Sequence, residues 1–264
     1  MNFRSVSDLN CLINKNINLI PKDVDLIIGI PRSGLLAATL ISLQLNLPLA
    51  DTAALLNGTI FDSGITKNKN NWINSIEEAR KILVVEDSSI SGASLESFKK
   101  SIENFKYKDR IIILTIYVTE FTKKYTDLYF EVCTPPRMFE WNYFHHSGII
   151  NACFDIDGVL CQDPTEEEND DGDKYINFIR NVTPRIIPTK KIGYIVTSRL
   201  EKYRSDTEYW LKKNNIEYDQ LIMLDLPSKE ERQRLGNHGS FKGNIYRKLR
   251  KSNLFIESNR KQAE

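Results

Sequence analysis

Two acidic motifs of this chain could carry chemistry, because each follows an apolar run of the kind that forms a buried strand. The first is the pair Glu86 and Asp87, which comes directly after the apolar residues 82–85. The second places Asp155 and Asp157 two positions apart after another short apolar run. In open α/β sheets, ligands bind outside the carboxyl ends of the strands, so both motifs mark candidate binding sites.

The loop after the first motif suits a phosphate group. It consists mainly of small and hydroxyl residues, among them Ser88, Ser89, Ser91, Gly92, Ala93 and Ser94. A helix is expected directly after this loop, and the N–H groups at a helix N-terminus form an anion cradle together with serine hydroxyls. The adjacent carboxylates of Glu86 and Asp87 can accept hydrogen bonds from two neighbouring hydroxyls. One diol and one phosphate at this spacing describe a ribose 5-phosphate.

The composition excludes several classes of protein. The chain has 264 residues, with 36 basic and 35 acidic side chains and a formal net charge of +1, so it lacks the basic surplus of a nucleic-acid-binding protein. No apolar run approaches the roughly 20 residues of a membrane span, and no apolar signal segment opens the chain. These features predict a soluble, cytoplasmic protein. Its four cysteines are not at metal-ligand spacing, which favours buried free thiols.

Apolar runs alternate with helical patterns in the first half of the chain. Strands are expected at residues 24–30, 82–85 and 110–118, and helices at residues 35–45, 76–80 and 95–105. A tight turn at residues 31–34 follows the first strand, and the polar residues 68–71 are expected to form a loop. This alternation predicts a mostly parallel sheet that is covered by helices on both faces.

A second alternating pattern begins after an aromatic stretch. Strands are expected at residues 151–154, 192–196, 220–224 and 254–256, helices at residues 206–214 and 241–249, and a solvated acidic loop at residues 166–173. We therefore predict two doubly wound, mostly parallel α/β domains in tandem, at residues 1–148 and 149–264, with a linker at about 135–148. Little chain follows the last strand, so we expect the second domain to be truncated at its C-terminus.

The first half of the chain resembles the type I phosphoribosyltransferases. The strand, the two acids and the serine loop are similar to the ribose-phosphate signature of that family, and the turn at residues 31–34 is similar to its pyrophosphate loop. The resemblance implies that phosphoribosyl diphosphate (PRPP) is the donor, with Mg²⁺ on its diphosphate. It also implies that Arg32 and the backbone N–H groups of Ser33 and Gly34 bind the diphosphate as it departs.

The aromatic stretch bears on the acceptor. Some members of this family hold a nucleobase against an aromatic wall, and Phe139, Trp141 or Tyr143 could serve in that way. Packing at a domain interface explains these side chains equally well. The choice between a nucleobase and another acceptor is therefore left open at this point.

The segment at residues 155–160 resembles the first motif of the haloacid dehalogenase superfamily of phosphatases. Residues two apart at a strand end project in similar directions, so one carboxylate can attack phosphorus while the other protonates the leaving oxygen. The resemblance implies that Asp155 is the nucleophile and that Asp157 is the general acid and base.

Three further motifs of that superfamily follow in order. The resemblance implies that Thr197 holds the phosphate and that Lys242 steadies the nucleophile and the phosphoryl charge. Glu257 matches the fourth motif, and together with Asp155 and Asp157 it is implied to bind Mg²⁺. The interval between the first two motifs is too short for a large cap domain, so a capless, open site is expected.

The order of the two halves resembles that of dual-domain ribofuranosyltransferases of bacterial surface-polysaccharide assembly. In that interpretation the first site transfers 5-phosphoribosyl to a glycan, which could be lipid-linked, and the second removes the 5-phosphate to leave ribofuranose. Two alternatives remain. One is a nucleobase phosphoribosyltransferase fused to a nucleotidase, and the other is a non-catalytic regulator that senses PRPP. The regulator gives no reason for an intact diphosphate turn or for a full set of phosphatase motifs.

Overall fold

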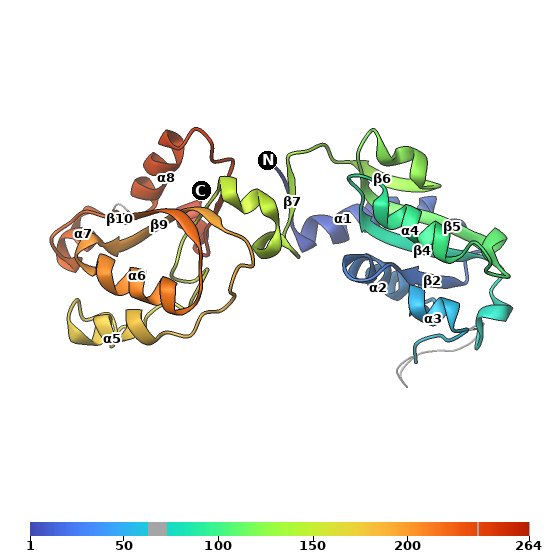
Figure 1. The fold of residues 1–264 in the computed structure, drawn as a ribbon, viewed down its shortest axis with the longest axis horizontal. Coiled ribbons are helices and arrows are strands. Elements are labelled where there is room, and N and C mark those ends of the chain that lie inside the picture. The colour runs from blue at the N-terminus through green and yellow to red at the C-terminus, as the bar shows by residue number, and fades with distance from the viewer. Residues whose placement is uncertain (63–72, 237, 264) are drawn as a thin grey trace. The chain divides into compact units, whose positions relative to one another are not determined.

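The computed structural model describes residues 1–62, 73–236 and 238–263 and divides them into two compact units (Figure 1). The first unit spans Asn2–Trp141, and the second runs from Asn142 to the end of the chain, with Met1 assigned to it. The loop expected at residues 68–71 lies outside the described residues. The boundary expected near Gly148 falls inside the second unit.

The first unit contains a five-stranded, fully parallel sheet in the order β3-β2-β4-β5-β6. Its strands are β2 (Leu26–Gly29), β3 (Leu49–Asp51), β4 (Ile82–Ser88), β5 (Ile111–Val118) and β6 (Leu128–Val132). The strand order reverses between β2 and β4, which makes this point the expected ligand crevice. Gly29 pairs with Val85 across that point. The turn after β2 and the acidic pair of β4 therefore lie at the same edge of the sheet.

Helices cover both faces of this sheet. They are α1 (Val6–Asn16), α2 (Ser33–Leu45), α3 (Thr52–Leu56) and α4 (Ala93–Ser101), with short 3-10 turns η1 (Ile17–Leu19), η2 (Ile76–Glu78), η3 (Lys108–Arg110) and η4 (Thr122–Tyr125). Alternate residues of β4 enter different cores: Leu83 and Val85 pack with α1 and α2, whereas Ile82 and Val84 pack with α3 and α4. Burial on both faces explains why this strand is almost continuously apolar.

A small two-stranded parallel sheet joins the start of the first unit to its end. In it β1 (Asn2–Arg4) pairs with β7 (Arg137–Phe139). This pairing holds the segment that leads to Trp141 against the N-terminus of the chain.

The second unit contains a four-stranded parallel sheet in the order β10-β9-β8-β11. The strands are β8 (Ala152–Phe154), β9 (Ile192–Leu200), β10 (Tyr218–Leu224) and β11 (Leu254–Ile256). The helices are α5 (Asp173–Asn181), α6 (Arg204–Lys213), α7 (Lys229–Leu235), α8 (His238–Lys248) and α9 (Arg260–Ala263), with 3-10 turns η5 (Tyr143–His145), η6 (Ser147–Asn151) and η7 (Glu201–Tyr203). The strand order reverses between β8 and β11, so Asp155 and Glu257 follow neighbouring strands at the reversal.

The structure confirms the parallel α/β architecture and corrects two local expectations. The expected strand end at Val85 is wrong, because pairing with β5 continues to Ser88 and places both acids inside β4. The helix expected at residues 95–105 ends at Ser101. The loop expected at residues 166–173 is confirmed as far as residue 172. The helix α5, which the sequence pattern did not predict, begins at Asp173 and buries an apolar face against the core.

A substitution at Gly193 tests the packing of the second unit, because a Cβ at this position would lie 2.1 Å from the carbonyl oxygen of Ile150. We expect Gly193→Ala to lower the free energy of unfolding of this unit by about 1–3 kcal/mol. The matched control is Gly243→Ala in α8, where a Cβ meets no atom within 4 Å; it should stabilise the unit by about 0.5–1 kcal/mol. Hydrogen exchange of the β9 amides in urea measures both effects, and equal protection in the two variants would contradict the packing.

Candidate functional site

The turn after β2 lies directly against the acidic pair of β4. A Cβ at Gly34 would lie 2.7 Å from the carbonyl oxygen of Val85 and 3.3 Å from the Cα of Glu86. Only glycine allows α2 to begin this close to the strand. Arg32 is exposed, and Ser33 opens α2, so a cation and helical N–H groups stand beside the carboxylates. The sequence-predicted diphosphate and ribose residues therefore come together.

Glu86 and Asp87 are buried and are held by neutral hydrogen-bond donors. Ser94 Oγ donates to Glu86 Oε2 at 2.8 Å, and Trp141 Nε1 donates to Asp87 Oδ2 at 2.9 Å. Burial, followed by the hydrogen bond and the charge of Asp87, raises the pKa of Glu86 to about 8. At neutral pH Glu86 therefore keeps its proton for most of the time, so this side chain can donate a hydrogen bond to a hydroxyl as well as accept one.

The serine loop is shaped by packing as much as by hydroxyl groups. Gly92 has a φ of +88° at the start of α4, and a Cβ there would lie 2.7 Å from the ring of Tyr125. Ser91 is exposed and accepts from the N–H of Ala93 at 3.4 Å. Ser89 is buried, and its Oγ has no hydrogen-bond partner in the described structure. Ser88 is half-buried at the end of β4.

Trp141 has a role that the sequence did not indicate. Its ring stacks on Phe139 with centroids 4.8 Å apart and an interplanar angle of 17°, while its N–H holds Asp87. Phe139 in turn packs on Tyr117 of β5. Tyr143 instead packs on the rings of Phe144 and Phe154 in the second unit. Nothing local in the sequence predicts the Trp141–Asp87 pair, because α4 and the three strands β5, β6 and β7 separate the two residues along the chain.

In the second unit, Lys242 joins three side chains at the carboxyl end of the sheet. Its Nζ donates to Asp155 Oδ2 at 2.5 Å, to Glu257 Oε2 at 2.6 Å and to Gln262 Oε1 at 2.9 Å. Burial opposes the charge of Lys242, but Asp155 and Glu257 outweigh it and raise the pKa of the ammonium. The sequence predicted that Lys242 steadies the nucleophile, and the geometry allows that role.

Asp155 and Asp157 have different partners. Asp155 is buried, and the N–H of Ile156 donates to its Oδ1 at 2.8 Å. Burial, with the nearby charges of Asp157 and Glu257, raises the pKa of Asp155 against the effect of Lys242. Asp157 instead accepts from Arg199, whose Nη2 lies 2.6 Å from Oδ1 and whose Nε lies 3.1 Å from Oδ2.

Arg199 was not among the residues assigned a role from the sequence. Its side chain is fully buried, so its charge requires the pairing with Asp157. It lies two residues beyond Thr197 in β9, and alternation along that strand puts both side chains on one face. That spacing is the signal that could have identified it.

A cleft of about 160 Å³ brings the sequence-predicted residues together. Its lining includes Asp155, Asp157, Thr197, Ser198, Arg232 and Lys242. Gly158 follows Asp157 in the chain with a φ of +76°, and a Cβ there would lie 2.1 Å from Ser258 Oγ, so the first motif needs this glycine. The arrangement allows a carboxylate to face a phosphate held by hydroxyls and cations.

The carboxylates of this cleft have the chemistry of a Mg²⁺ site, although the described residues contain no group of three His, Cys, Asp or Glu side chains placed to hold an ion. Hard oxygen donors suit Mg²⁺. Burial and the charges of Asp157 and Glu257 raise the pKa of Asp155, and a cation would relieve the repulsion among these carboxylates. Lys242 contacts both Asp155 and Glu257. A bound ion would share these oxygens with it.

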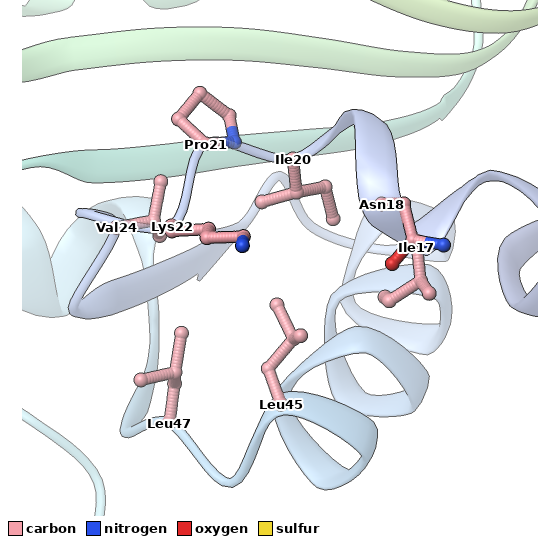
Figure 2. Close-up of a pocket in the computed structure, with 8 residues that line it drawn as sticks. All are labelled: Ile17, Asn18, Ile20, Pro21, Lys22, Val24, Leu45 and Leu47. Carbon is pink, nitrogen blue, oxygen red and sulfur yellow. The ribbon is translucent and has the colours of Figure 1, made fainter.

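A separate hollow of about 500 Å³ lies at the opposite edge of the first sheet, before β2 and after α2. Figure 2 shows Ile20, Leu45 and Leu47 turned toward it. Its lining is mostly apolar and contains no carboxylate or hydroxyl side chain. Among the described residues, no helix has the length and apolar character to cross a membrane.

Comparison with known proteins finds structural neighbours for about half of the chain. No family model and no curated protein matches it. A purine phosphoribosyltransferase from Pyrococcus horikoshii is similar at a TM-score of 0.38 and 20% identity, over 53% of this chain and 92% of that one. The xanthine-guanine-hypoxanthine phosphoribosyltransferase of Helicobacter pylori gives 0.38 and 17% over 53% and 92%. Leishmania donovani UMP synthase gives 0.30 and 17% over 45% and 24%.

The raised pKa of Glu86 predicts a pH-dependent stability. Between about pH 4.5 and 8 the folded state keeps a proton that the unfolded state has lost, so stability falls as pH rises, by at most about 1.4 kcal/mol per pH unit. Glu86→Gln should reduce this fall, whereas Glu96→Gln, on the exposed face of α4, should not. Hydrogen exchange of the β4 amides at pH 5 and pH 8.5 measures the difference. An identical fall in Glu86→Gln and wild type would exclude the shifted pKa.

Proposed function

We propose that this chain transfers the 5-phosphoribosyl group of PRPP to a glycan and then hydrolyses the 5-phosphate, leaving a ribofuranosyl residue. The observation that carries the proposal is the recurrence of one arrangement: in each unit, carboxylates and anion-binding groups meet where the strand order reverses. Neutral donors hold the carboxylates of the first unit, whereas cations pair with those of the second. This difference suits two consecutive tasks on one sugar, the binding of a ribose and the removal of its phosphate.

The first step is a displacement at C1 of the ribose. The C1–O bond to the diphosphate breaks, the acceptor oxygen bonds to C1, and the acceptor proton is lost. Arg32 and the N–H groups at the start of α2 would neutralise the departing diphosphate. Glu86 and Asp87 would hold the ribose hydroxyls, and the loop from Ser88 to Ser94 would bind the 5-phosphate. Mg²⁺ would supply further neutralisation of the diphosphate.

The second step is a two-stage hydrolysis. An Asp155 oxygen would bond to phosphorus while the bond to the ribose O5 breaks, and Asp157 would protonate O5. Asp157 would then take a proton from the water that hydrolyses the aspartyl phosphate, releasing inorganic phosphate. Arg199 fixes the direction of the Asp157 carboxylate, Thr197 would hold the phosphate, and Mg²⁺ on the carboxylates would balance the charge.

Removal of the 5-phosphate favours a glycan over a nucleobase as the acceptor. A salvage enzyme that made a nucleotide would gain nothing from a phosphatase that discharged it. A glycan that receives a phosphoribosyl group must lose the phosphate before it carries plain ribose. In addition, the hydrogen bond from Trp141 to Asp87 gives the aromatic stretch a purpose other than binding a base.

Product mass tests both steps. The protein is incubated with PRPP, Mg²⁺ and a panel of synthetic glycans, lipid-linked glycans and nucleobases. We expect a glycan that gains a pentose, and Asp155→Asn should accumulate the phosphopentose product instead. Asp219→Asn, on the exposed side of β10, is the matched control and should behave as wild type.

A variant that carries both Glu86→Gln and Asp87→Asn completes the experiment. It should transfer nothing but still remove phosphate from a supplied phosphoribosyl glycan. If Asp155→Asn yields the dephosphorylated product at the wild-type rate, the assignment of the second step is wrong. If only nucleobases are modified, the glycan acceptor is wrong.

Trp141→Phe tests whether the indole N–H positions Asp87 for the ribose. The variant keeps an aromatic ring beside Phe139 but loses the N–H donor together with part of the indole. We expect the Kd for PRPP to rise about tenfold, because a hydrogen bond to a charged group is lost. Trp210→Phe is the control, since the Trp210 indole donates to the carbonyl oxygen of Val182 in the second unit. Calorimetric titration with PRPP and Mg²⁺ should separate the two variants, and equal affinities would refute this role.

A further inference from the structure

Two cations line the phosphatase cleft, Lys242 and Arg232, and Arg199 lies beside it as the partner of Asp157. Lys242 is paired with Asp155 and Glu257, and Arg199 is paired with Asp157. The other lining cation is Arg232, on α7, with 8% of its surface exposed. It takes part in no ion pair among the described residues, and this distinguishes it from the other two.

The protein satisfies the Arg232 guanidinium only in part. Its Nη1 donates to the carbonyl oxygen of Ser198 at 3.0 Å, which fixes the side chain against the end of β9. Its Nε is buried and has no hydrogen-bond partner in the described structure, and the same is true of Ser198 Oγ. A buried donor without a partner costs free energy, and a buried charge without a counterion costs more.

Both of these incompletely satisfied groups line the same cleft as the nucleophile. Arg232 and Ser198 border it together with Asp155 and Thr197. Lys242 has all three of its N–H donors engaged, by Asp155, Glu257 and Gln262. The cation that is free to meet an incoming anion in this cleft is therefore Arg232, within the part of the chain that the structure describes.

We propose that Arg232 and Ser198 form an anion subsite that binds the non-bridging oxygens of a phosphate monoester while Asp155 attacks the phosphorus. The inference rests on the proposed phosphatase step and adds a residue outside the four motifs. A guanidinium can pair two N–H groups with two phosphate oxygens, which an ammonium cannot do. The subsite thus favours monoester dianions, which carry two negative charges on three terminal oxygens, over diesters, which carry one charge on two.

The test compares two arginines of one helix. Arg232→Gln removes the proposed contact, whereas Arg234→Gln removes an exposed arginine of α7 that pairs with Glu231. The readouts are the KM and kcat for hydrolysis of ribose 5-phosphate and the inhibition constant of inorganic phosphate, all with the full chain and Mg²⁺. For Arg232→Gln we expect the KM and the inhibition constant each to rise about 10- to 100-fold. Arg234→Gln should change neither by more than about twofold.

A conservative variant separates the loss of the phosphate contact from a general loss of stability. Arg232→Lys keeps the charge and loses the two-pronged contact, so at an unchanged melting temperature it should raise the phosphate inhibition constant about 3- to 10-fold. An unchanged constant in a folded Arg232→Lys, or equal constants in Arg232→Gln and Arg234→Gln, would overturn the subsite while leaving the phosphatase in place. A wild-type chain that neither hydrolyses ribose 5-phosphate nor binds phosphate would overturn the proposed function itself.

Discussion

The burial of each parallel sheet on both faces is the constraint on which the rest of the structure depends. Helices cover both faces of the first sheet, and the apolar residues of β4 enter one core or the other in turn. Polar groups can then act only at or beyond the carboxyl ends of the strands, and the reversal of strand order opens space there. Both units place their carboxylates at that point: Glu86 and Asp87 are in the last residues of β4, beside the turn after β2, and Asp155 and Glu257 directly follow β8 and β11.

The two units compensate buried carboxylates in opposite ways. In the first, Glu86 and Asp87 receive neutral donors from Ser94 and Trp141, and mutual repulsion is relieved by retention of a proton. This suits groups that bind hydroxyls without reacting. In the second, the cations of Lys242 and Arg199 pair with Asp155 and Asp157 and fix the positions of these carboxyl groups, which suits the proposed nucleophile and the proposed general acid. The kind of group that stabilises the buried carboxylates therefore agrees with the reaction step proposed for each site.

Local pattern was enough to predict most strands and the positions of the acidic motifs. The strand at Leu254–Ile256 matches its expected bounds, and the parallel architecture follows from the alternation. The pairs Trp141–Asp87 and Arg199–Asp157 could not be predicted, since they depend on which strands become neighbours. The same holds for the extension of β4, which comes from pairing with β5. The sequence thus indicated which acidic residues form the candidate sites, but their hydrogen-bond and ion-pair partners depend on tertiary contacts.

The fate of the 5-phosphate tests the central claim most directly. PRPP carrying ³²P only at the 5-phosphate is supplied with Mg²⁺ and an acceptor glycan. If the two sites act in order, one labelled inorganic phosphate is released for each unlabelled diphosphate. Without the acceptor, neither product is released. Label that stays on the glycan at completion, or that is released as inorganic phosphate before any diphosphate appears, would contradict the account.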